Sequence, residues 1–261
     1  MQRVRQIAGS VLAGVCVTLL AVAPARAQSA EEGTTTWRDK AFLDVNVGMR
    51  LTSNPFEEHL TPIIYSEPAS IAASHVAGAR WALVDFGAGV RVWKSVGVGA
   101  TYAKFGFTED VNVDAHVPNP VLFNQTRSAT KVAPLNRNET ALHFHVLWVR
   151  PVTPRIDIML SAGPSMIKVM QDLVTGIELS EGAPPFVTVA IGNVLTVTRE
   201  DRVFGLNFGI GGTYFMTPLV GVGGTLRYTT GSVSTELGDG GTADLSLGGF
   251  QVAFGARLRF R

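Results

Sequence analysis

One group of residues in the chain has the side-chain types of a hydrolase. His143 and His145 lie two residues apart, and Asp157 and Ser161 follow shortly after them. If the chain turns at 152–153 between two antiparallel strands, paired residues have numbers that add up to about 304, and His143 lies opposite Ser161. A serine activated by a histidine and oriented by an aspartate is the arrangement of serine hydrolases.

The same histidines could also reach one metal ion, because alternate residues of a strand share a face. No acidic or cysteine ligand stands beside His143 and His145 at a recognised spacing, however. The chain also lacks the G-x-x-x-x-G-K-[ST], H-E-x-x-H and nucleotide-binding motifs. We therefore predict no catalytic, cofactor-binding or metal-binding residues, and we interpret these histidines, with Asp157 and Ser161, as interior hydrogen-bonding groups. A membrane lipid hydrolase stays open as an alternative.

The first 27 residues have the pattern of a secretory signal peptide. A short basic stretch with Arg3 and Arg5 precedes an apolar stretch at 7–22, and Ala25-Arg26-Ala27 supplies small residues for cleavage. The apolar stretch is shorter than the ~20 residues that a spanning helix needs. We predict a cleaved signal peptide at 1–27, a short periplasmic segment at 28–39 and one domain at 40–261.

The composition excludes several classes of protein. Charged residues make up 16% of the chain, against roughly 25% in an ordinary soluble domain. Lys and Arg number 22 against 21 Asp and Glu, so no basic excess favours nucleic-acid binding. The one cysteine, Cys16, lies in the predicted signal peptide, so the exported chain is stabilised without disulfides.

Alternation of apolar and polar residues with period two dominates the rest of the chain and predicts β-strands. One face of each predicted strand is almost wholly apolar, and the other mixes Asp, Arg, His, Asn, Gln, Thr and Gly. Eight segments show this pattern: 41–52, 82–92, 96–102, 142–148, 156–162, 204–210, 220–228 and 250–260.

The connections between these segments alternate in length. Tight turns are predicted at 93–95, 151–154 and 216–218, and long loops at roughly 53–79, 107–139, 172–202 and 231–244. Short turns on one side and long loops on the other are typical of outer-membrane barrels. We therefore predict an all-β fold: an eight-stranded, antiparallel, up-and-down transmembrane β-barrel in the cell outer membrane. A soluble calycin-like barrel with its apolar faces inside is the alternative.

Charges on the polar faces of the first two strands suggest a register. The residue numbers of Asp44 and Arg91 add up to 135, and so do those of Arg50 and Asp85. Paired residues of two antiparallel strands have a constant sum of residue numbers, so both pairs fit one alignment. We expect them to neutralise each other inside the barrel. Eight strands enclose a space about wide enough for side chains to fill, so an open pore is not expected.

The strand pattern and the C-terminal segment from Phe250 to Phe260 resemble the small OmpA-like outer-membrane barrels. This resemblance implies that the last strand is read by the barrel-assembly machinery. We expect a monomer in contact with outer-membrane lipids, and Lys104 beside Tyr102 could reach lipopolysaccharide phosphates. The predicted role is structural or surface interaction through four outer loops, and a narrow channel for small or apolar solutes is an alternative.

Two apolar stretches interrupt the predicted loops. Ile63-Ile64-Tyr65 lies in the first loop and Val121-Leu122-Phe123 in the second. Exposed apolar residues in loops can mark binding sites. We expect these stretches instead to pack on each other over the mouth of the barrel.

Overall fold

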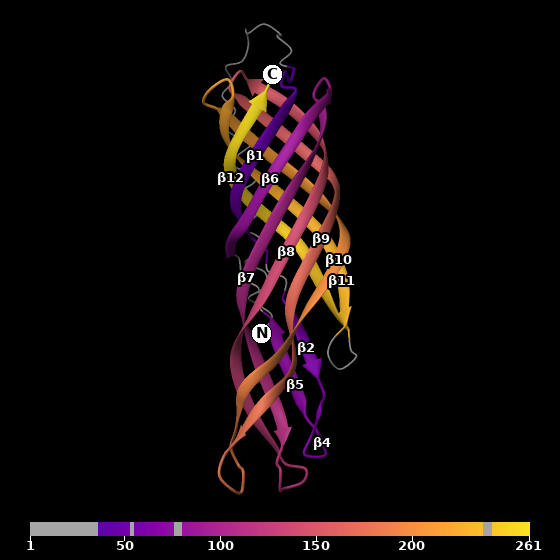
Figure 1. The fold of residues 1–261 in the computed structure, drawn as a ribbon, viewed down its shortest axis with the longest axis vertical. Helices are drawn as coiled ribbons and strands as arrows, with labels where there is room; N and C mark the ends of the chain where they lie inside the picture. The colour runs from indigo at the N-terminus through magenta and orange to yellow at the C-terminus, as the bar shows by residue number, and fades with distance from the viewer. Residues whose placement is uncertain (1–35, 53–54, 76–79, 237–241) are drawn as a thin grey trace, which may run out of the picture. The chain divides into compact units, whose positions relative to one another are not determined.

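The computed structural model describes residues 36–52, 55–75, 80–236 and 242–261. Nearly all of these residues belong to antiparallel β-strands (Figure 1). In this part of the chain no α-helix is long and apolar enough to cross a membrane. The predicted signal peptide at 1–27 and most of the segment at 28–39 lie outside the described residues.

Eight of the described strands close into a ring. Each strand pairs antiparallel with the next, and the last pairs with the first, so the barrel has no free edge at this level. All eight predicted segments overlap with one of these strands, and the predicted barrel is confirmed. The strands are β1 (Ala41–Arg50), β6 (Arg80–Trp93), β7 (Val96–Pro118), β8 (Thr126–Thr153), β9 (Ile156–Glu181), β10 (Val189–Phe215), β11 (Val220–Glu236) and β12 (Thr242–Phe260).

The barrel presents apolar side chains outward and polar side chains inward. On β12, Phe254 and Leu258 are exposed, whereas Gln251 and Arg257 are buried. Every strand contributes to the outer apolar belt, for example through Val45, Phe86, Val98, Val146, Leu160, Phe208, Val222 and Phe254. A closed barrel with this orientation spans a membrane, because each backbone polar group is paired and lipid meets apolar groups. The chain is an outer-membrane protein.

The end of the barrel with the short turns is closed by the residues before β1. Trp37 is buried in a cluster with Phe42, Leu147, Val149 and Met159. Glycine makes room for Trp37, since a Cβ atom at Gly97 would lie 2.8 Å from its ring. In the segment at 36–39, the side chains of Trp37 and Asp39 are therefore buried at this end of the barrel.

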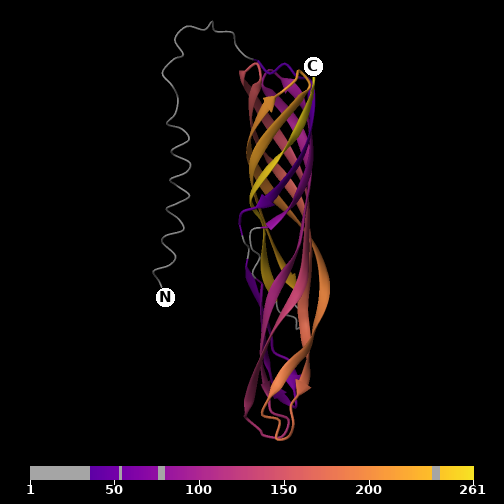
Figure 2. The same cartoon turned by 90° about the vertical axis from the view of Figure 1, so that its left-hand side faces the viewer.

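Four strands continue past the barrel at its other end. β7, β8, β9 and β10 form an extension, which occupies the lower half of Figure 1 and is seen from the side in Figure 2. Two further strands, β2 (Phe56–Leu60) and β5 (Ser70–His75), add to the edge of β7, and β3 (Ile63–Ile64) pairs with β4 (Glu67–Pro68). The prediction of long loops at 53–79, 107–139, 172–202 and 231–244 is therefore wrong, because most of these residues form strands.

The extension is a small sandwich with a hydrophobic core. In the described strands, the pairing of β8 with β9 ends at Arg137–Gln171, so the sheet β2–β5–β7–β8 separates from the hairpin β9–β10. The two layers enclose a cluster that contains Leu60, Ile71, Val111, Val113, Val117, Leu135, Val174 and Ile191. Outward residues of this part of β7, such as Asp110, Asn112 and Asp114, are polar and exposed. The polarity of the two faces is thus the reverse of that in the barrel, as expected for a segment surrounded by water.

Candidate functional site

The structure separates the residues of the possible hydrolase group. His143 lies opposite Ser165, not Ser161, and its Nδ1 atom is 2.7 Å from the Ser165 hydroxyl. The Nε2 atom of His145 is 3.0 Å from the hydroxyl of Thr101. Both histidines are buried inside the barrel. The predicted alignment of His143 with Ser161 is wrong.

The error comes from the position of the turn between β8 and β9. The strands continue to the pair Thr153–Ile156 after an irregularity at Pro151, so the turn lies at 154–155. Asp157 lies close to this turn, where its carboxylate faces Arg259 at 3.8 Å. Within the described ranges, no cluster of three His, Cys, Asp or Glu residues is arranged to hold a metal ion.

Opposite charges do pair inside the barrel, but not in the predicted register. Asn46 lies opposite Asp85 and donates a 2.6 Å hydrogen bond to it. The predicted pairs Asp44–Arg91 and Arg50–Asp85 therefore do not form. Two observed pairs, Arg227–Asp85 and Arg50–Glu139, join strands that are not neighbours in the ring. Arg257–Asp44 joins the neighbouring strands β12 and β1, and Arg137–Glu139 lies within β8.

These side chains fill the barrel. The space beside His145 and Arg227 measures about 20 Å³, which is close to the volume that one water molecule needs. Phe215 packs under Arg259 with 3.6 Å from the guanidinium carbon to the ring centre, near the end that Trp37 closes. The interior therefore leaves little room for a permeating solute.

A buried polar cluster lies where the barrel passes into the sandwich. His75 on β5 is 2.7 Å from Glu109 on β7 through Nδ1, and its Nε2 contacts Glu58 on β2. Gln171 on β9 donates a 2.8 Å hydrogen bond to Glu109. Asp110 beside Glu109 faces the solvent, so this level is outside the membrane.

The charges of this cluster stabilise each other. Burial opposes the charged form of His75, but hydrogen bonds to Glu109 and Glu58 outweigh it and hold the pKa of His75 above its usual value. Burial likewise favours the neutral form of Glu109, but hydrogen bonds from His75 and Gln171 outweigh it and lower the pKa of Glu109. The cluster joins β2, β5, β7 and β9, and so ties both layers of the sandwich together.

Three chain segments meet at the far end of the sandwich and form what we call the tip. They are the β3–β4 hairpin, the β7–β8 loop and the β9–β10 loop (Figure 1). The backbone amide of Asn124 contacts the Glu67 carboxylate at 3.3 Å, and the Asn119 side chain donates a 3.1 Å hydrogen bond to the Phe186 carbonyl. Large apolar side chains project from all three segments: Ile63, Tyr65, Val121, Leu122, Phe123 and Val187.

These apolar side chains do not cover the mouth of the barrel, so the expectation that they pack there on each other is wrong. Phe123 is 79% exposed, Ile63 is 70% exposed and Val187 is 68% exposed. The sequence had indicated two of the three stretches. Val187 was missed because its apolar stretch, Phe186-Val187, is only two residues long and follows Pro184 and Pro185.

A buried arginine holds the three segments of the tip together. Arg127 donates hydrogen bonds to the Glu181 carboxylate at 3.0 Å and to the Pro118 carbonyl at 2.7 Å. The Tyr65 hydroxyl donates a 2.9 Å hydrogen bond to the same carboxylate. The hydrogen bond from Arg127 lowers the pKa of Glu181, and the hydrogen bond to Glu181 raises the pKa of Tyr65. Exposed apolar groups are thus carried on a fixed polar frame.

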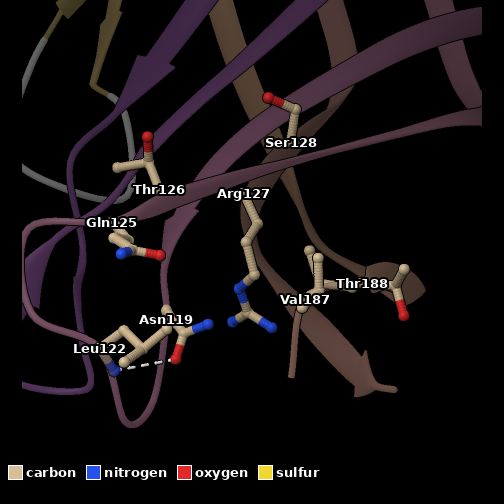
Figure 3. Close-up of a pocket in the computed structure, with 9 residues that line it drawn as sticks. Asn119, Leu122, Gln125, Thr126, Arg127, Ser128, Val187 and Thr188 are labelled. Atoms are coloured by element: carbon tan, nitrogen blue, oxygen red, sulfur yellow. Dashed lines mark hydrogen bonds between the residues drawn. The ribbon is translucent and has the colours of Figure 1, made fainter. Parts of the chain in front are cut away.

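A pocket of about 320 Å³ opens between two of these segments (Figure 3). Arg127 lies between Asn119 on one side and Val187 on the other, and Leu122 lies next to Asn119. The side-chain oxygen of Asn119 accepts hydrogen bonds from the amides of Val121 and Leu122, which fixes the loop. The tip therefore offers a partner both exposed apolar side chains and a small polar recess.

Similarity to known proteins extends to the arrangement of strands alone. No protein-family model matches the chain, and no curated protein matches its sequence. Among solved structures, it is similar to the Neisserial surface protein A (12% identity, TM-score 0.41, covering 84% of this chain and 97% of that one). It is also similar to OprG from Pseudomonas aeruginosa (8% identity, TM-score 0.46, covering 86% of this chain and 97% of that one). A third similar structure is the protease OmpT from Escherichia coli (10% identity, TM-score 0.45, covering 88% of this chain and 99% of that one). We carry no role over from these proteins, and membership of the OmpA-like family stays a prediction.

Proposed function

We propose that the protein is a surface-interaction protein of the outer membrane, in which the barrel is the anchor and the tip is the binding surface. The observation that carries this proposal is the exposure of Phe123, Ile63 and Val187 on three separate segments that meet at one place. Exposed apolar side chains gathered on a polar protein surface mark interaction sites.

The frame beneath the tip supports the same proposal. The Arg127–Glu181–Tyr65 hydrogen bonds and the core of the sandwich hold the apolar groups in fixed positions before a partner arrives. A preorganised surface loses less conformational entropy on binding than flexible loops do. A partner that fits the tip has an apolar surface with a polar group able to enter the recess beside Arg127.

The structure gives less support to a channel or a hydrolase than to a surface-interaction protein. The barrel interior is filled by paired charges, and His143 and Ser161 are not opposite each other. We therefore propose a role without catalysis, and we propose that the barrel acts as a monomer.

Cell adhesion tests this function. Cells that display the wild-type protein are compared with cells that display Ile63→Ser/Phe123→Ser/Val187→Ser, using attachment to octyl-coated beads and to a cultured epithelial layer. We expect the triple variant to lose most of the attachment. A control variant, Asn112→Ser/Asp114→Ser, changes exposed residues on the side of the sandwich and should attach like the wild type. Equal attachment by the triple variant at equal surface display would refute the proposal.

A further inference from the structure

A row of basic side chains crosses four strands on the outer face of the barrel. Lys104 on β7 lies opposite Thr140 on β8, Thr140 lies opposite Lys168 on β9, and Lys168 lies opposite Arg202 on β10. Neighbouring strands are about 4.8 Å apart, so the row is about 14 Å wide. The side chains of Arg202 and Lys168 are 75% and 39% exposed, and Lys104 is also exposed.

An apolar row runs next to the basic row, two residues nearer to the middle of the barrel. It consists of Tyr102, Leu142, Met166 and Phe204, which are paired across the same four strands and are all exposed. A groove of about 210 Å³ is lined by residues of both rows, and Lys168 and Arg202 stand at its polar side. The face therefore combines cations with an adjoining apolar slot.

The basic row marks the outer limit of the apolar belt. Along β7, the outward residues are apolar up to Tyr102 and polar from Thr108 onward, and on β8 Asn138 follows Thr140. The sandwich begins on the outer side of this level. The short turns lie at the opposite end of the barrel, which in such barrels faces the periplasm. The row thus lies at the headgroup level of the outer leaflet.

The charge balance of the row is positive. Glu200 contacts Lys168 at 2.8 Å and Arg202 at 3.4 Å, so one acidic group stands against three basic ones. At the corresponding outer ends of β11 and β12, the outward residues include Thr230, Ser232 and Phe250, which carry no charge. These outward residues of β11 and β12 therefore add no charge to the basic row.

We propose that this face, from β7 to β10, binds a glycolipid that carries two phosphates and several acyl chains, the chemistry of lipid A. The phosphates contact Lys104, Lys168 and Arg202, because guanidinium and ammonium groups form charge-assisted hydrogen bonds with phosphate. An acyl chain lies in the groove between Met166 and Phe204. The width of the row suits two phosphates on one disaccharide better than the single phosphate of a phospholipid.

Native mass spectrometry of the full-length protein, extracted from outer membranes in a mild detergent, tests the proposal. The probes are lipid A, lipid A after enzymatic dephosphorylation, phosphatidylglycerol and inorganic phosphate. We expect the wild type to bind one lipid A, and dephosphorylated lipid A, phosphatidylglycerol and phosphate to bind at least tenfold more weakly. The variant Lys104→Gln/Lys168→Gln/Arg202→Gln should lose at least tenfold in affinity for lipid A.

The matched control is Lys94→Gln/Arg150→Gln/Arg155→Gln, which removes three exposed basic residues at the short-turn end. It should bind lipid A like the wild type. Heat-dependent gel mobility of each variant confirms that the barrel is folded before binding is compared. Undiminished lipid A binding by the first variant, an equal loss in the control, or equal binding of phosphatidylglycerol would each overturn the proposal.

Discussion

Removal of one partner of the buried Arg50–Glu139 ion pair should strongly destabilise the barrel. Two nitrogen–oxygen contacts join the side chains, one of them 2.9 Å long, and Arg137 donates a further hydrogen bond of 3.0 Å to Glu139. Arg50 and Glu139 are only 5% and 4% exposed. Breaking such a pair leaves an uncompensated buried charge and costs about 3–5 kcal/mol. We expect this loss in free energy of unfolding for Arg50→Ala and for Glu139→Ala.

A double-mutant cycle separates the interaction from the other effects of each change. The destabilisation of Arg50→Ala/Glu139→Ala should be smaller than the sum of the single effects by about 1–3 kcal/mol. The measurement is urea unfolding of the barrel in lipid vesicles, followed by tryptophan fluorescence and by gel mobility.

The cycle between Arg50 and Asp85 is the matched control. Asp85 lies opposite Asn46, four residues and therefore about 13 Å along β1 from Arg50. Asp85 pairs with Arg227 and Arg50 pairs with Glu139, so the two ion pairs share no partner, and the effects should add within about 0.5 kcal/mol. Additivity in the Arg50–Glu139 cycle, or strong coupling in the Arg50–Asp85 cycle, would refute the observed register.

Three further predictions concern the belt, the sandwich and the polar cluster. Phe254→Arg places a charge against lipid and should cost about 2–4 kcal/mol more in vesicle unfolding than Gln251→Arg, which faces the interior; equal costs would mean that the faces are wrongly assigned. Val113→Asp should increase cleavage of the sandwich by an added protease, whereas Asn112→Asp should not, because Val113 is fully buried and Asn112 faces water; the reverse order would exclude the hydrophobic core. The contribution of His75, whose pKa is raised, is complete below its ordinary value of 6.5 and is lost as the pH rises through the raised pKa. The contribution of Glu109, whose pKa is lowered, is complete above 4.5 and is lost as the pH falls through the lowered pKa. Amide protection in β5 should therefore be highest at about pH 4.5–6.5, and in His75→Gln the decline above this range should disappear.

The sequence predicted the barrel correctly because lipid imposes a simple pattern on it. Apolar residues such as Phe254 must alternate with interior residues such as Gln251, and this alternation can be read without a structure. The registers could not be predicted, since they depend on where each turn closes. The β8–β9 turn lies at 154–155, not at 152–153, and together with the one-residue shift at Pro151 this position brings Ser165, not Ser161, opposite His143.

The sandwich was missed although its pattern is also present in the sequence. Val111, Val113, Ala115 and Val117 alternate with polar residues, but here the apolar residues face inward. The continuous strand β7 thus reverses the polarity of its two faces between Tyr102 and Glu109. If one face is expected to stay apolar along a whole strand, the sequence pattern predicts that the strand ends at this reversal and that a loop follows. The tip could not be predicted from the sequence, because its three segments are far apart in the chain and meet only where Arg127 and Glu181 join them in the folded structure.

Cysteine labelling on intact cells tests most directly the claim that the barrel carries the sandwich and its tip outside the cell. The sequence after the predicted signal peptide has no cysteine, so Phe123→Cys, Lys94→Cys and Val146→Cys each introduce a single thiol. A membrane-impermeant maleimide should label Phe123→Cys on intact cells, Lys94→Cys only after the outer membrane is permeabilised, and Val146→Cys only after unfolding. Labelling of Lys94→Cys but not Phe123→Cys on intact cells, or ready labelling of Val146→Cys in the folded protein, would contradict the account.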